Sequence, residues 1–150
     1  MQRSQMCKEF IVTSPGALID NASATTNSID TLGYDYVTID VILGATDIAL
    51  TALKVQEADA DTGYADVTGL VWGTSANIAG ATSTLPSATD DNKVFKFEID
   101  LRGRKRWLDV VATFGDGTVG GYIAILAKLW RAKDGPITAS ERGCAEILRV

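Results

Sequence analysis

The chain has 150 residues, of which 46% are hydrophobic and 22% charged, so it can bury a core and is not disordered as a whole. Its formal net charge of −5 argues against a free-standing nucleic-acid binder, because contacts to phosphates need a basic surface. No apolar run approaches the length of a membrane span, and the start MQRSQMCKEF holds no hydrophobic signal core, so we expect neither a membrane partner nor secretion.

The residue inventory also limits the chemistry. The chain has no histidine, which removes the commonest general base and makes Ser-His-Asp and Cys-His arrangements impossible. With only Cys7 and Cys144 as thiols, the usual four-ligand zinc set is absent too. We therefore expect no enzyme, no metal and no cofactor, with Asp/Glu-only catalysis as the remaining catalytic alternative. We expect reduced thiols; the two can pair only if the chain ends meet, which the sequence leaves open.

Residues 1–28 contain few core-forming side chains. Glu9–Thr13 is a short strand candidate, stopped by the turn sequence Ser14-Pro15-Gly16, and a stretch rich in Asn, Ser and Thr follows. We predict that residues 1–28 form an extended N-terminal arm and loop, and that residues 29–150 form the folded domain.

Three strands are predicted next, because apolar and polar side chains alternate with the period of an extended strand at 36–43, 49–57 and 64–71. Gly44–Asp47 and Asp59–Gly63 separate them as turns. The second turn lacks the glycine and glutamate that an EF-hand loop requires, so we interpret it as a hairpin turn and not as a calcium site. Residues 73–92, small and polar, form the longest predicted loop.

Residues 94–114, VFKFEIDLRGRKRWLDVVATF, carry the clearest alternation, which we interpret as a β-hairpin with a polar connection. The connection concentrates positive charge in an acidic chain. Arginine forks suit partner carboxylates, and aromatic residues with a polar group are favoured at interfaces. Our candidate interface residues are Arg102, Arg104, Lys105, Arg106, Trp107, Trp130 and Arg131. The alternative is a solvated turn beside ordinary core aromatics.

Two C-terminal segments are ambiguous. Tyr122–Arg131 is apolar on nearly both faces, and we predict a strand covered on both sides because the rest of the chain is β. Thr138–Val150 is either a short helix begun by a capping box of Thr138 with Glu141 or a final strand, which we favour. Eight strand candidates without βαβ alternation predict an all-β, single-domain antiparallel β-sandwich of jelly-roll type.

The runs KVQEAD, GYADVTG, IDLRGRKRWLDVVATFGDGT and RAKDGPITASERG resemble small proteins encoded among the head genes of tailed bacteriophages, the head decoration (cement) and minor capsid proteins. The resemblance covers most of the chain from Pro15 onward. It implies a β-sandwich on the exterior of an icosahedral capsid, usually oligomeric, that bridges capsomers. On this basis we expect a structural virion protein, made in the host cytoplasm, whose partners are the major capsid protein and its own copies in a homotrimer.

A different class of function remains as the alternative. A carbohydrate-binding β-sandwich of a phage fibre or adhesion protein would need an exposed aromatic platform for sugar stacking. The candidates for it are Trp72, Trp107, Trp130, Tyr34 and Tyr36.

Overall fold

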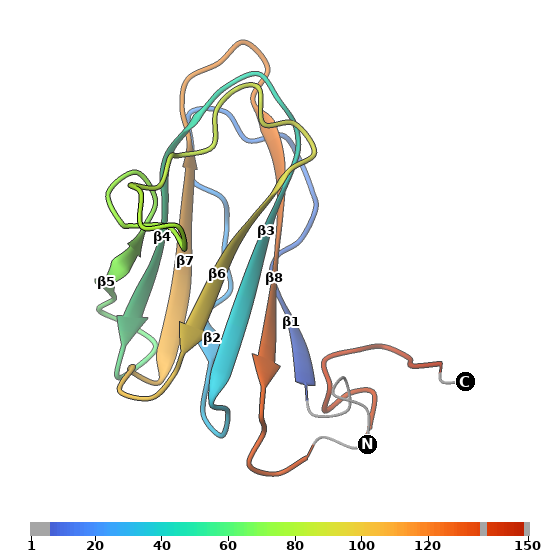
Figure 1. The fold of residues 1–150 in the computed structure, drawn as a ribbon. Helices are drawn as coiled ribbons and strands as arrows, with labels where there is room; N and C mark the ends of the chain where they lie inside the picture. The colour runs from blue at the N-terminus through green and yellow to red at the C-terminus, as the bar shows by residue number, and fades with distance from the viewer. Residues whose placement is uncertain (1–6, 136–137, 149–150) are drawn as a thin grey trace.

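The computed structural model describes residues 7–135 and 138–148, and these are all-β. The strands are β1 (Cys7–Thr13), β2 (Ile29–Asp30), β3 (Tyr36–Thr46), β4 (Leu50–Ala58), β5 (Ala65–Val71), β6 (Val94–Asp100), β7 (Trp107–Phe114) and β8 (Gly121–Trp130). Sheet A has the order β1-β8-β3-β6 and sheet B the order β2-β7-β4-β5 (Figure 1). The described residues contain no helix long and apolar enough to cross a membrane.

The strand pairing is that of a jelly roll. β1 pairs with β8, β2 with β7, β3 with β6 and β4 with β5, all antiparallel. The chain is thus a nested antiparallel ribbon that is wrapped so that its strands fall into two sheets. The predicted antiparallel β-sandwich of jelly-roll type is confirmed.

The core lies between the two sheets, where the apolar side of each strand points. On β7 every second side chain is buried, from Leu108 at 0% exposure to Phe114 at 1%. On β8 the buried set runs from Ile123 to Leu129. The two-residue period therefore predicts correctly which face of each strand is inside.

Residues 94–114 do not form a hairpin, although both strands exist. β6 pairs with β3 in sheet A, whereas β7 pairs with β4 and β2 in sheet B. The connection 101–106 crosses from one sheet to the other. The pairing prediction is wrong because alternation defines the buried face of a strand and not its neighbour.

The sandwich begins within the segment that was predicted to be an N-terminal arm. Cys7–Thr13 is an edge strand of sheet A, and Val12 is completely buried. The following loop binds along both sheets, through the Ile19↔Gly121 bridge and the Ser23↔Thr113 bridge. The predicted boundary at residue 28 is therefore wrong from Cys7 onward, and residues 1–6 lie outside the described part of the chain.

The two ambiguous segments have different outcomes. The strand predicted at 122–131 exists as Gly121–Trp130, but only one of its faces is fully buried, since Tyr122 on the other face is 44% exposed. Residues 138–148 form no strand, so the favoured prediction is wrong. Thr138 and Glu141 do make the reciprocal hydrogen bonds of a capping box, at 2.9 and 3.2 Å, but the turn they begin ends at Gly143, which has a φ of 72°.

Candidate partner interface at one end of the sandwich

All the predicted interface residues lie at one end of the sandwich. β6 and β8 both run antiparallel to β3, so their last residues lie at the same end of sheet A, and β7 starts there after the crossing connection (Figure 1). We call this surface the charged end and define it as residues 30–36, 57–59, 100–107 and 130–131. The seven candidates come together there, although 29 positions separate Arg102 from Arg131 in the chain.

Two of its arginines form close pairs with aspartates. Arg102 contacts Asp100 at 2.5 Å, and hydrogen bonds from Arg102 lower the pKa of Asp100 to about 2. Arg106 binds Asp30 with both ends of its fork, at 2.8 and 2.7 Å, which lowers the pKa of Asp30 as well. The guanidinium of Arg106 also lies 5.2 Å from the ring centroid of Trp107. Both arginines are therefore held in defined orientations.

The other two cations of the connection bind the end of β4. Arg104 lies 3.6 Å from Glu57, and the ammonium of Lys105 lies 3.1 Å from Asp59. The backbone N–H of Lys105 donates to Glu57 at 3.1 Å. These contacts join the connection, which comes from sheet A, to a strand of sheet B.

The residues that follow β8 complete the charged end. Arg131 has a left-handed backbone, with a φ of 57°, and its guanidinium lies 5.7 Å from the ring centroid of Tyr36 and 3.8 Å from Asp35. The indole N–H of Trp130 donates to the hydroxyl of Thr38 at 3.1 Å. Trp130 is thus a half-buried residue of the outer face of sheet A.

The charged end is consequently mixed in sign. The sequence shows four cations close together, but each of them faces a carboxylate in the fold. Asp100 could have been found, because it precedes Arg102 by two residues. Asp30 lies 76 residues from Arg106 in the chain, and only the fold brings the two together. Exposed ion pairs of this kind contribute little to the stability of the fold.

The five candidate aromatic residues share no single surface. Tyr36 and Trp130 lie opposite each other on the outer face of sheet A, whereas Trp107 lies on the outer face of sheet B. Tyr34 packs against the core. Trp72 packs against the core, where its ring meets that of Phe95 edge-on, with the ring centroids 5.3 Å apart and an interplanar angle of 84°. The predicted sugar-stacking platform is not assembled.

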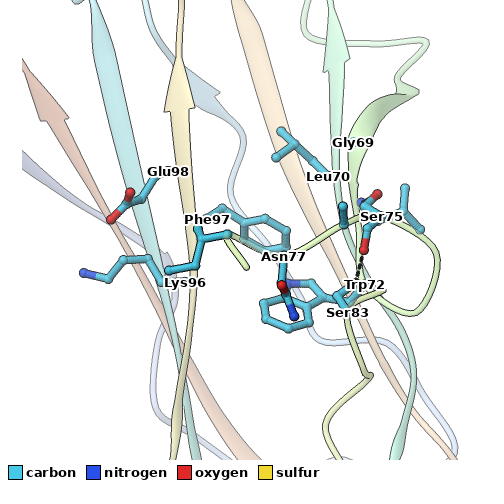
Figure 2. Close-up of a pocket in the computed structure, with 12 residues that line it drawn as sticks. Gly69, Leu70, Trp72, Ser75, Asn77, Ser83, Lys96, Phe97 and Glu98 are labelled. Atoms are coloured by element: carbon cyan, nitrogen blue, oxygen red, sulfur yellow. Dashed lines mark hydrogen bonds between the residues drawn. The ribbon is translucent and has the colours of Figure 1, made fainter. Parts of the chain in front are cut away.

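A cleft of about 440 Å³ opens beside Trp72, between the edge strands β5 and β6. Leu70 and Phe97 line it together with Trp72, and Asn77 and Ile78 of the 72–93 loop border it (Figure 2). Its walls are mainly apolar. No local pattern predicts this cleft, because it depends on where the two sheets separate.

The two cysteines are free thiols, but their segments meet. The N–H of Glu9 in β1 donates to the carbonyl of Arg142 at 2.8 Å, which lays the C-terminal segment over the outer side of β1. Cys7 is only 4% exposed, and burial raises the pKa of its thiol.

No protein-family model matches the chain, and no curated protein matches it. Among solved structures, the chain is similar to the crystal structure of the SPBc2 prophage-derived protein YomS. The TM-score is 0.50 at 11% sequence identity, over 83% of this chain and 93% of that one. The likeness is one of fold. It extends over nearly the whole sandwich.

Proposed function

We propose that the chain is a non-catalytic structural protein of a bacteriophage virion that binds the exterior of the head and reinforces the contacts between capsomers. The resemblance to head decoration and minor capsid proteins supports this proposal, as does the likeness to a prophage-derived protein. The observation that carries it is the charged end, where all seven interface candidates converge.

The partner in this proposal is the major capsid protein. The forks of Arg102 and Arg106 are already oriented by Asp100 and Asp30. On docking, acidic groups of neighbouring shell subunits would share these guanidinium groups, while Trp107 would supply apolar contact area. A rigid sandwich end that touches two subunits at once gains its full binding free energy only when both subunits are in place. Its binding therefore stabilises the assembled lattice.

Co-sedimentation with assembled heads tests the proposal. Wild-type protein should sediment with heads of the phage that encodes it, and less so as salt rises, because the contacts are ionic. If it stays in the supernatant at every salt concentration, the proposed function is wrong.

A pair of matched variants tests the charged end separately. Arg102→Ala with Arg104→Ala should weaken head binding by about tenfold or more and flatten its salt dependence. Lys54→Ala with Lys93→Ala removes the same charge outside the charged end, from pairs with Asp66 and Asp90, and should bind as wild type does. Equal loss in both variants would mean that net charge, not this surface, determines binding.

The fibre or adhesion alternative has lost the surface on which it rested, since Trp107, Trp130 and Trp72 are on different sides of the sandwich. We therefore do not propose it.

A further inference from the structure

The four edge strands of the two sheets are not equally protected. An unpaired edge presents a row of free N–H and C=O groups, and proteins usually cover or interrupt such rows. The edges here are β1 and β6 in sheet A, and β2 and β5 in sheet B.

Three of the edges are covered or interrupted. The C-terminal segment binds to the edge of β1, through the backbone hydrogen bond from Glu9 to the carbonyl of Arg142. β2 has only two residues. The pairing of β5 with β4 shifts register, and β5 itself contains Gly69 with a φ of 89°. The N–H of Val71 is bonded to the hydroxyl of Ser75 at 3.0 Å.

β6 lacks every one of these devices. Its seven residues pair with β3 in unbroken register, from Asp100↔Tyr36 to Val94↔Ile42. The bonds from Leu101 to Asp35 and from Leu43 to Lys93 fix which residues of this ladder bond to β3.

Successive residues of an antiparallel strand direct their backbone groups to opposite sides. Residues 93 and 101 bond to β3, so the odd-numbered residues between them do so as well. The N–H and C=O groups of the even-numbered residues, among them Lys96 and Glu98, therefore point to the free edge. Within the described residues these groups make no backbone bond to any other element.

The side chains of β6 leave that edge accessible. Figure 2 shows Lys96 and Glu98 pointing away from the cleft and Phe97 pointing toward Trp72. Ile78, in the loop across the cleft, is fully exposed, and Val94 is 58% exposed. The inward-facing side chains of β6 are apolar, so this strand has no inward-pointing charge of the kind that prevents edge-to-edge pairing.

We propose that two copies of the chain pair through their β6 strands, antiparallel about a two-fold axis at Phe97, and so join two A sheets into one continuous eight-stranded sheet. The inference goes beyond the proposed function and does not depend on it. The free groups of Lys96 and Glu98 would bond to the same groups of the second copy, as in peptide addition to a sheet edge.

Charge selects the register. The free backbone groups of the two copies can bond only when an even-numbered residue of one β6 strand lies opposite an even-numbered residue of the other. Registers centred on Lys96 or on Glu98 would place like charges face to face, which is unfavourable. The register centred on Phe97 places Lys96 opposite Glu98 of the second copy, twice. Lys96 already lies 3.0 Å from Asp40, so its ammonium would lie between two carboxylates.

Charge-swapped variants test the pairing by light scattering on a sizing column. Wild type should have twice the mass of one chain. Lys96→Glu or Glu98→Lys alone puts like charges opposite at both positions, and should weaken dimerisation by about tenfold or more. The double variant should dimerise again, and a mixture of the two single variants should form mixed dimers.

A backbone variant tests the same edge without a change of charge pattern around Asp40. Glu98→Pro removes an N–H that makes no bond within the described residues of one copy, so the fold should persist, as monitored by circular dichroism, while the dimer is lost. Glu98→Ala keeps this N–H and should remain a dimer, weakened less. A wild-type monomer at all concentrations, a trimer mass, or dimers unaffected by Glu98→Pro would each overturn the proposal.

Discussion

The carboxylate of Asp47 accepts a hydrogen bond from the backbone N–H of Gly120 at 2.7 Å, although 73 residues separate the two in the chain. Its second oxygen accepts from the N–H groups of Thr118 and Val119, at 3.0 and 2.8 Å. One side chain between β3 and β4 thus satisfies three donors of the connection that leads into β8. These bonds, that of Gly120 first, lower the pKa of Asp47 below its ordinary value of 3.8.

We expect Asp47→Ala to lower the midpoint of thermal unfolding at neutral pH by a few degrees, and Asp47→Asn to lower it less, because the amide oxygen still accepts. Since the folded pKa is depressed, the stabilisation is complete above the unfolded pKa and is lost as the pH falls through the folded value. The difference between wild type and Asp47→Asn should therefore shrink below about pH 4. Asp116→Ala, in the same connection, is the control and should change little.

Gly121, at the start of β8, is required by its neighbours. A Cβ there would collide with the ring of Phe114 and lie 2.6 Å from the hydroxyl of Thr46. We expect Gly121→Ala to destabilise the fold by about 1–3 kcal/mol, as overpacking does. Phe114→Leu should restore part of that loss in a double-mutant cycle from denaturant unfolding. Gly16→Ala, whose Cβ would lie 3.7 Å from its nearest neighbour, should cost little. Strict additivity of Gly121→Ala and Phe114→Leu would contradict this account.

Two truncations separate β1 from the residues before it. Removing residues 1–13 takes away a whole strand of sheet A and the buried Val12, whose side chain alone contributes about 1.5–3 kcal/mol by burial. It also opens the edge of β8. We expect this variant to aggregate or to lose cooperative unfolding. Removing residues 1–6 leaves β1 intact, and the thermal midpoint should stay near that of wild type. If both truncated proteins fold equally well, β1 is dispensable.

The sequence was sufficient for the long strands and their buried faces. Leu108 and Phe114 belong to a run whose alternation states which side is inside, and both are buried. It was insufficient for strand neighbours, because β6 offers the same apolar face whether it pairs with β7 or with β3. Ile29–Asp30 is too short to show any period, so β2 was missed.

The candidate interface could likewise be predicted only in part. The cations of residues 102–106 stand out in an acidic chain, so composition was enough to find them. Their carboxylate partners come from distant segments, with Glu57 lying 48 residues from Lys105. Such pairs form because the jelly roll brings distant segments together, and no local sequence pattern predicts them. The free edge of β6 is likewise visible only once all four edges are known.

Gly143 lies where the C-terminal segment meets β1, and we expect this segment to shield the buried Cys7. The φ of Gly143 is 72°, and a Cβ would collide with the carbonyl oxygen of Glu9. Gly143→Ala should therefore displace the segment and raise the rate at which a thiol reagent labels Cys7 by about tenfold or more. In wild type, burial raises the pKa of Cys7 above 9.0, so labelling should be slow at neutral pH and accelerate only in alkaline solution. Gly33→Ala, also at a positive φ but with no atom near its Cβ, is the matched control. Equal labelling of Cys7 in both variants and wild type, followed by mass spectrometry, would show that the C-terminal segment does not protect it.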